Sequence, residues 1–180
     1  MTSKKDIRLY AKKIKTDIDL PSVSSLITDK LLALPELKTP GCVMLYRALG
    51  DEVNVDGLLY RLHNTGIDFC FPVVCGDVIE ARSISDDGFK TGAFGISEPT
   101  GAFVDPGAID VVIVPGVAFD VECMRLGRGK GYYDRFLSST NALKIGVCPD
   151  CLCLDKLPCE QHDLRVDVVI TEKRTVWYGR

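Results

Sequence analysis

The stretch from Arg125 to Asp134 reads Arg-Leu-Gly-Arg-Gly-Lys-Gly-Tyr-Tyr-Asp and holds the residue types best suited to chemistry. Three glycines alternate with cations, and glycine lets the backbone approach a ligand closely and adopt positive φ. Backbone N–H groups and fixed cations suit a polyanion. The aspartate could hold the metal ion that accompanies a nucleoside triphosphate. A flexible turn with solvated charges would explain the run equally well, since a short motif is only a hypothesis.

The residues around this run favour a phosphate site. Residues 109–114 are apolar and β-branched, which is typical of a buried strand. Residues 132–137 have helical character, and a helix that begins at the end of a glycine loop adds free N–H groups and a positive dipole end. The run is not a P-loop, because Met124 stands at the required glycine and Gly131 replaces the hydroxyl residue. Its glycine spacing also differs from the dinucleotide fingerprint.

Length and composition set the class of protein. The chain has 180 residues, 46% of them hydrophobic, which is enough for one domain with a sizeable core. A net charge of -3 argues against broad nucleic-acid binding, though it leaves room for a local cationic pocket. No apolar run approaches the ~18 residues that span a bilayer, and the polar start lacks a signal peptide. We therefore expect a cytoplasmic protein, a monomer or weak homodimer, that binds small molecules and neither nucleic acid nor membrane.

Eight cysteines are present, and without an export signal free thiols are expected rather than disulfides. The segment from Cys148 to Cys153 contains Cys-x-x-Cys-x-Cys, with Cys159 and His162 downstream. Such residues could ligate zinc tetrahedrally, which would favour a binding or regulatory module. The ligands are crowded compared with a zinc ribbon, and the segment also continues a predicted strand.

Two helices are predicted at the start of the chain. In residues 4–18 an apolar face is formed by Ile7, Ala11, Ile14 and Ile18, and a basic face by Lys4, Arg8, Lys12 and Lys15. Taken alone, that basic face is a solvated surface. A second helix is expected to run from about Pro21 to Leu34, with Ser22 as its N-cap.

Strands and helices then alternate. Helices are expected at 55–64 and 132–137. Strands are expected at 42–46, 69–74, 78–82, 109–114, 143–148, 166–171 and 175–178, with short ones near Phe94 and Phe103. Pro72 suggests an edge position or an early exit from the sheet. The pattern predicts an α/β fold: a single-domain three-layer α/β/α sandwich with a mostly parallel, Rossmann-like sheet over residues 1–180. Ligands of such sheets bind beyond the carboxyl ends of the strands, so the loops after Tyr46, Val114 and Cys148 are candidate walls of one site.

Over nearly its whole length the chain resembles the 5-formyltetrahydrofolate cyclo-ligase family, also called 5,10-methenyltetrahydrofolate synthetase. The resemblance is carried by ordered pieces, of which the central one is highly specific. They are Lys4 and Arg8, Tyr46 before residues 51–53, Gly-Ile-Ser-Glu-Pro at 95–99, Val-Pro-Gly-Val-Ala-Phe-Asp at 114–120, the run 125–137, His162-Asp163 and residues 166–172.

The resemblance implies an enzyme that uses ATP and Mg²⁺ to convert 5-formyltetrahydrofolate into 5,10-methenyltetrahydrofolate. It assigns catalytic roles to Arg125, Arg128 and Lys130. ATP contacts are assigned to these three residues and to Lys4, Arg8, Gly127, Gly129, Gly131, Tyr132 and Tyr133. It assigns substrate binding to Glu52, Arg128, Lys130 and Tyr132, with Glu52 accepting N–H bonds from the pterin. Mg²⁺ is assigned to Asp134 and Asp163, although nearby Asp167 could be mistaken for the latter.

Some positions stay open at this point. Tyr132 and Tyr133 would either stack on a ring or anchor the helix in the core, and Glu98 would either belong to a site loop or only to a turn. Two residues depart from the family pattern: Arg47 stands where an apolar pocket residue is expected, and Cys123 stands where glycine is usual. A different enzyme on a similar scaffold, such as a sugar-phosphate isomerase or an acyl-group transferase, is the rival reading of the fold.

Overall fold

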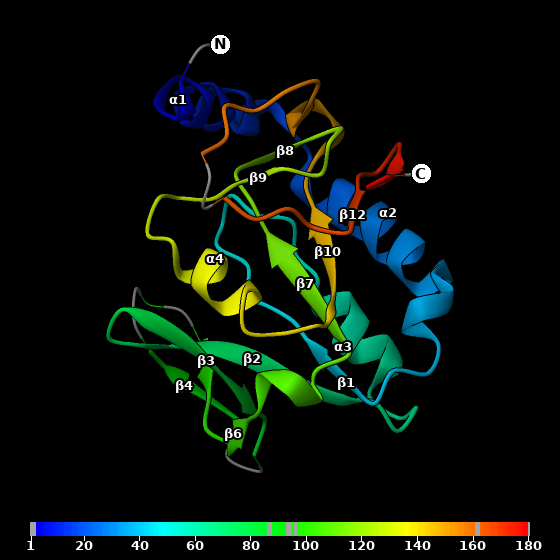
Figure 1. The fold of residues 1–180 in the computed structure, drawn as a ribbon. Coiled ribbons are helices and arrows are strands. Elements are labelled where there is room, and N and C mark those ends of the chain that lie inside the picture. Colours follow the sequence, from blue (N-terminus) through cyan, green and yellow to red (C-terminus); the bar gives the residue numbers. More distant parts are fainter. Residues whose placement is uncertain (1–2, 86–87, 93–94, 96, 161–162, 180) are drawn as a thin grey trace.

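The computed structural model describes residues 3–85, 88–92, 95, 97–160 and 163–179. Its centre is an eight-stranded sheet with the order β13-β12-β10-β7-β1-β2-β3-β6 (Figure 1). The parallel strands are β1 (Cys42–Met44), β2 (Asp68–Cys75), β7 (Val111–Pro115), β10 (Leu143–Val147) and β12 (Val168–Ile170). Antiparallel strands complete the edges: β3 (Val78–Ser83), β6 (Phe103–Val104) and β13 (Thr175–Trp177). The mostly parallel sheet that the sequence predicts is confirmed.

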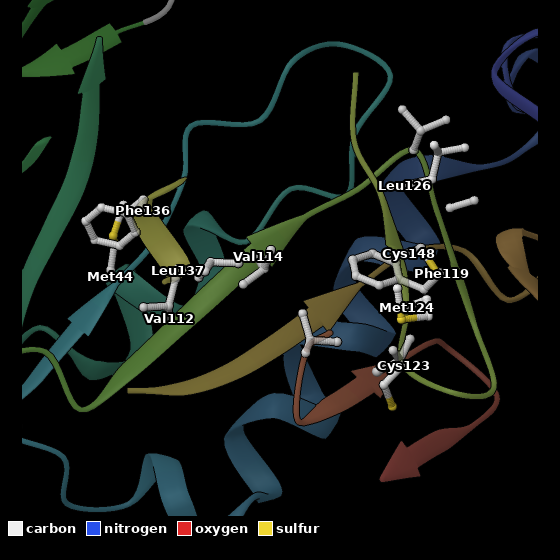
Figure 2. Close-up of a cluster of buried hydrophobic side chains, with 14 of the residues drawn as sticks. Met44, Val112, Val114, Phe119, Cys123, Met124, Leu126, Phe136, Leu137 and Cys148 are labelled. Atoms are coloured by element: carbon white, nitrogen blue, oxygen red, sulfur yellow. The ribbon is translucent and has the colours of Figure 1, made fainter. Parts of the chain in front are cut away.

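Helices cover both faces of this sheet because successive side chains of each strand point to opposite sides. One face is covered by α2 (Leu20–Ala33) and α3 (Asp56–Leu62), whose buried residues belong to the same cluster as Val111 and Ile113. The other face carries α4 (Tyr132–Leu137). Figure 2 shows Phe136 and Leu137 of this helix directed toward Met44 and Val112. The arrangement is helix, sheet, helix, as predicted.

Smaller elements stand beside the sheet. A three-stranded sheet is formed by β11 (Cys153–Leu154), β8 (Ala118–Asp120) and β9 (Arg125–Leu126), and a two-stranded one by β4 (Phe89–Thr91) and β5 (Ser97–Pro99). The first helix, α1 (Lys4–Ile14), buries Ile7 and Ala11 in the core cluster that contains Phe119 of β8. Short 3-10 turns lie at Lys15–Asp17, Pro35–Leu37, Pro106–Ala108 and Asp150–Leu152. The strands β8, β9 and β11 are too short to be recognised from alternation alone.

Three local expectations need correction or refinement. Ser22 does not cap α2; Asp19 does, because its carboxylate accepts a hydrogen bond from the Ser22 backbone N–H at 3.2 Å. Lys15 is not on a solvated face, since it is only 8% exposed. Pro72 lies in an interior strand, yet β1 pairs with β2 only as far as Cys70, so the missing N–H falls beyond that ladder. The strand expected near Phe94 lies outside the described residues.

Among the described residues, no helix combines the length and apolar character that crossing a bilayer requires.

Candidate active site

A cavity of about 1000 Å³ opens beyond the carboxyl ends of the central strands. Its walls come from α1, the segment after β1, the glycine run, α4 and the residues Glu160, Asp163 and Leu164. The segments after Tyr46 and Val114 line it as predicted. The loop after Cys148 contributes only its far end, through Glu160 and Asp163. Residues at opposite ends of the sequence therefore meet in one site.

The glycine run forms the floor of this cavity between β9 and α4. Gly129 has φ of 102° and Gly131 has φ of 67°, a left-handed backbone that residues with a Cβ rarely adopt. Gly131 is the residue directly before α4. Arg128, Gly129 and Lys130 are exposed, and the Lys130 ammonium has no hydrogen bond or ion pair within the part of the chain that the structure describes. An exposed, unpaired cation beside a left-handed loop is suited to an anionic ligand.

Arg125 is held differently from the other cations of the run. Its side chain is buried and donates to Asp134 Oδ1 at 2.9 Å and to the Pro115 carbonyl at 3.2 Å. Its guanidinium carbon lies 5.5 Å from the centre of the Tyr133 ring. Within the described residues, Arg125 Nε and the Tyr133 hydroxyl are buried without a hydrogen-bond partner. Because a buried polar group without a partner is costly, these two atoms indicate room for a polar ligand or water in this wall.

The first helix supplies two more cations. Lys4 Nζ lies 2.6 Å from Asp163 Oδ2 and 3.0 Å from Glu160 Oε1, and Arg8 Nε donates to the Gly127 carbonyl at 2.9 Å. Partial desolvation lowers the pKa of Lys4, but the hydrogen bonds and charges of Asp163 and Glu160 outweigh it, so the net shift is upward. Lys4 therefore stays charged, and the predicted pair of α1 cations does face the glycine run.

Glu52 also lines the cavity and is fixed by its neighbours. Its Oε2 accepts the Leu49 backbone N–H at 3.0 Å, and its Oε1 accepts Arg128 Nε at 3.0 Å. Arg128 also donates through Nη2 to Asp51. Burial raises the pKa of Asp51, but the hydrogen bond from Arg128 and the charges of Lys15 and Arg128 more than offset this and lower it. The residue predicted to bind pterin thus touches a residue predicted to bind phosphate.

The two tyrosines have different surroundings. Tyr133 points inward, and burial raises the pKa of its hydroxyl. Tyr132 lines the cavity with its ring below Arg135, whose guanidinium carbon is 5.5 Å from the ring centre, and its hydroxyl donates to the Gly76 carbonyl at 3.5 Å. Both tyrosines line the cavity; Tyr133 packs against the buried Arg125, whereas Tyr132 packs against Arg135.

The predicted metal residues Asp134 and Asp163 line the same cavity, each paired with a cation, Arg125 or Lys4 respectively. Asp167 is excluded as an alternative, because its carboxylate accepts the Lys144 backbone N–H at 2.7 Å and it does not line the cavity. In the described ranges, no group of three or more His, Cys, Asp or Glu side chains is arranged to hold a metal ion. Two carboxylates fit Mg²⁺ only when nucleotide phosphates complete the oxygen shell, which is how proteins commonly bind this ion.

The cysteine-rich segment shows no metal-binding arrangement among its described residues either. Cys148 and Cys153 are buried, whereas Cys151 and Cys159 are exposed, and the described cysteines are all free thiols. They form no metal-binding group with one another or with described neighbours. His162, the other candidate ligand, lies outside the described residues.

The structure also shows the surroundings of Arg47 and Cys123, which depart from the family pattern, and of Glu98. Arg47 lines the cavity, donates to Asp56 at 2.7 Å and lies 4.2 Å above the Phe89 ring. Glu98 is buried in the cavity wall and accepts the Val74 backbone N–H at 3.4 Å, so its segment belongs to the site. Cys123 has φ of 58° and thereby keeps a glycine-like backbone.

Sequence reasoning missed several residues of the site. Asp51, Glu160 and Arg135 all pair with predicted site residues or line the cavity. Asp51 could have been found from its position next to Glu52. Arg135 and Glu160 give no such signal, because only the fold brings them to the cavity.

The fold and this cavity together define an α/β enzyme whose site joins a glycine–cation loop to a carboxylate-lined wall. The sequence model of the 5-formyltetrahydrofolate cyclo-ligase family matches residues 1–172, and the chain belongs to this family of ligases. It is 32% identical over 155 residues to the 5-formyltetrahydrofolate cyclo-ligase of Mycolicibacterium smegmatis, covering 79% of this chain and 80% of that one.

Solved structures agree. The NMR structure of Aquifex aeolicus 5,10-methenyltetrahydrofolate synthetase superposes with a TM-score of 0.88 at 34% identity, covering 98% of this chain and 93% of that one. The 5,10-methenyltetrahydrofolate synthetase of Mycoplasma pneumoniae shares the fold, with a TM-score of 0.78 at 24% identity over 94% of this chain and 98% of that one.

Proposed function

We propose that this enzyme cyclises 5-formyltetrahydrofolate to 5,10-methenyltetrahydrofolate, consuming ATP with Mg²⁺ and releasing ADP and phosphate. The observation that carries the proposal is the 3.0 Å contact between Arg128 and Glu52, because it joins the predicted phosphate side to the predicted pterin side in one cavity. The γ-phosphoryl group and the formyl group must meet for this reaction, so the two sides have to be neighbours.

The chemistry requires activation of an unreactive amide. The formyl oxygen on N5 is a poor leaving group and its carbon a weak electrophile. Transfer of the γ-phosphoryl group to that oxygen forms an O–P bond, breaks the bond to the β-phosphate oxygen and releases ADP. N10 then attacks the activated carbon and loses its proton, and phosphate leaves as the new ring closes. Catalysis of the transfer consists mainly of positioning and charge stabilisation.

The residues of the site differ in how firmly their neighbours hold them, and their proposed roles differ accordingly. Lys130 has a free ammonium and is the group best able to follow charge onto the transferred phosphoryl oxygens. Lys4, Arg8 and the N–H groups of Gly127, Gly129 and Gly131 would hold the triphosphate. Arg125 is already bound to Asp134 at 2.9 Å, so it would set the position of the metal ligand as well as add positive charge. Tyr132 would line the boundary between the nucleotide and folate sides.

Mg²⁺ would be held by Asp134 and Asp163 together with phosphate oxygens, and when bound it would neutralise charge that develops on the phosphates. Asp134→Asn should therefore raise the Mg²⁺ concentration required for half-maximal activity. A magnesium titration of product formation in both proteins measures this. An unchanged titration would remove Asp134 from the metal site.

The lining of the cavity runs from Lys4 to Leu164, so we further propose that residues 1–180 act as one ATP- and folate-binding unit. A cytoplasmic location and a monomeric or weakly dimeric state remain predictions from the sequence.

The direct test mixes purified protein with 5-formyltetrahydrofolate, ATP and Mg²⁺ and follows the absorbance of the methenyl product, with ADP measured in parallel. One ADP per product formed is expected, and omission of ATP should abolish the signal. Absence of both product and ADP would favour the rival enzyme class on the same scaffold.

A further inference from the structure

Four charged side chains form a continuous row beside the cavity. Lys15 Nζ lies 3.4 Å from Asp51 Oδ2, Asp51 Oδ1 accepts Arg128 Nη2, and Arg128 Nε donates to Glu52 Oε1 at 3.0 Å. Two of these residues, Arg128 and Glu52, belong to the proposed catalytic and substrate-binding set. The other two, Lys15 and Asp51, have no role in the proposed reaction.

Lys15 lies in a buried position that requires an oppositely charged partner. Its side chain is 6% exposed, and its one ion pair within the described residues is with Asp51. Burial of a lysine ammonium is unfavourable unless it is paired, and the contact with Asp51 supplies that partner. Lys15 also follows Lys4 and Arg8 at helical spacing, eleven residues being close to three turns. The face of α1 that presents Lys4 and Arg8 thus continues into the 3-10 turn at Lys15–Asp17, whose first residue pairs with Asp51.

Both carboxylate oxygens of Glu52 already accept a hydrogen bond before any substrate arrives. Its Oε2 holds the Leu49 N–H and its Oε1 holds Arg128. An amino-pyrimidinone edge offers two parallel N–H groups, and a carboxylate accepts such a pair with both oxygens. A pterin bound in this way shares Oε1 with Arg128 and so weakens the bond from Arg128 Nε. Arg128 then keeps its bond to Asp51 through Nη2, while its Nε becomes free to donate elsewhere.

We propose that Lys15 and Asp51 are positioning residues that hold Arg128 at the boundary between the two substrates, so that folate binding at Glu52 turns Arg128 toward the phosphoryl group of ATP. This inference rests on the proposed function and adds to it a coupling between the two substrates. Lys15 holds Asp51 in place, and Asp51 holds Nη2 of Arg128. Bound folate would determine which group Nε of Arg128 contacts.

The consequence for binding is positive coupling. Folate substrate should raise the affinity for a non-hydrolysable ATP analogue, by a factor in the usual range of roughly 5- to 150-fold, because it frees a donor of Arg128. Without Asp51, the released guanidinium has no tether and samples other positions. The variants should therefore lose the coupling and the chemical step, while affinity for the analogue in the absence of folate changes little.

The experiment compares Lys15→Met, Lys15→Arg and Asp51→Asn with wild type, and uses Lys12→Met as the control because Lys12 is an exposed lysine of α1, just before the turn that holds Lys15. We expect kcat for methenyl formation to fall roughly 10- to 100-fold in Lys15→Met and Asp51→Asn, as for a displaced catalytic group. Lys15→Arg should recover most of the rate, and Lys12→Met should match wild type. Calorimetric titration of the ATP analogue, with and without 5-formyltetrahydrofolate, should show the coupling only where Asp51 and a cation at position 15 are both present.

Wild-type kcat and intact coupling in folded Asp51→Asn would overturn the inference, and so would equal losses in Lys15→Met and Lys15→Arg accompanied by a lower unfolding temperature. Asp51→Asn keeps the test valid if Lys15→Met does not fold, since the Asp51 side chain is 47% exposed. A wild-type protein that forms no methenyl product would instead refute the proposed function, so the two failures are distinguishable.

Discussion

The two halves of the segment from Asp120 to Gly131 use the same unusual backbone for different purposes. Cys123 has φ of 58° and Gly129 has φ of 102°. Cys123 itself is buried, and its thiol lies 3.5 Å from the Val176 carbonyl oxygen. The carboxylate of Asp120 accepts hydrogen bonds from the neighbouring backbone N–H groups. The loop at Gly129 is exposed and lines the cavity among cations. A left-handed residue therefore does not by itself mark a binding loop; exposure and the neighbouring charge distinguish the two.

The first half is closed around a single carboxylate. Asp120 Oδ1 accepts the backbone N–H groups of Glu122 and Met124, both at 2.9 Å, and Oδ2 accepts that of Leu157 at 2.8 Å. In the second half the glycine run lines the cavity, and the Lys130 ammonium has no partner among the described residues. The first half thus stabilises the fold, and the second half can bind ligand. The following variants test that division.

Lys130→Ala should have the largest effect. Loss of one preorganised electrostatic group costs about 2–4 kcal/mol of transition-state stabilisation, which would lower kcat/KM by roughly 30- to 1000-fold. The free energy of unfolding should not change, because Lys130 is exposed. Steady-state kinetics and urea unfolding measure the two quantities, with Lys156→Ala as an exposed lysine outside the cavity. Wild-type turnover in Lys130→Ala would contradict the assignment.

Gly129→Ala should rank next. A Cβ at this φ is strained, and the loop must shift to relieve the strain, which displaces the flanking cations. Displacement of catalytic groups by about 1 Å costs roughly a hundredfold in rate. Thermal unfolding should be almost unaffected. If stability falls as much as activity, the loop is a structural turn like the one at Cys123 and the comparison fails.

Asp120→Asn should show the reverse behaviour. Its carboxylate accepts three backbone N–H groups, two of them in buried hydrogen bonds, and an amide offers only one acceptor oxygen and adds donors of its own. Hydrogen bonds to a charged group contribute about 1.5–3 kcal/mol each, so we expect a loss of about 2–3 kcal/mol in unfolding free energy. Urea unfolding tests this. If kcat/KM per folded molecule falls as far as in Lys130→Ala, the turn at Cys123 also determines the geometry of the site.

Cys123→Gly should have the smallest effect. Replacement by glycine removes about 1–2 kcal/mol of left-handed backbone strain, which stabilises the protein. Two terms oppose this: the lost burial of a small side chain, about 1 kcal/mol, and the greater conformational freedom of glycine in the unfolded chain. The terms nearly cancel, so stability should stay within about 1 kcal/mol of wild type, with unchanged activity. Cys123→Val is the informative companion, because a β-branched residue at this φ should destabilise clearly.

The sequence was sufficient for the layers of the fold and for the centre of the site. β-branched runs such as residues 111–114 identify buried strands, and glycines between cations identify a loop whose backbone and charge both suit phosphate. Local pattern could not identify β8, β9 and β11, because strands of two or three residues show no periodicity. Nor could it show that Lys15 is buried, since its spacing also fits a solvated helix face. The Arg128–Glu52 contact joins residues 76 positions apart, and only the fold brings them together.

The ion pair between Lys4 and Asp163 joins residues 159 positions apart and makes the site depend on both ends of the described chain. During synthesis, the wall that holds the first helix against the glycine run is completed only after residue 163 has left the ribosome. Early intermediates would expose the α1 cations to solvent without their carboxylate partners. Nucleotide binding should consequently appear late in folding, as the last long-range closure rather than as a nucleus for it.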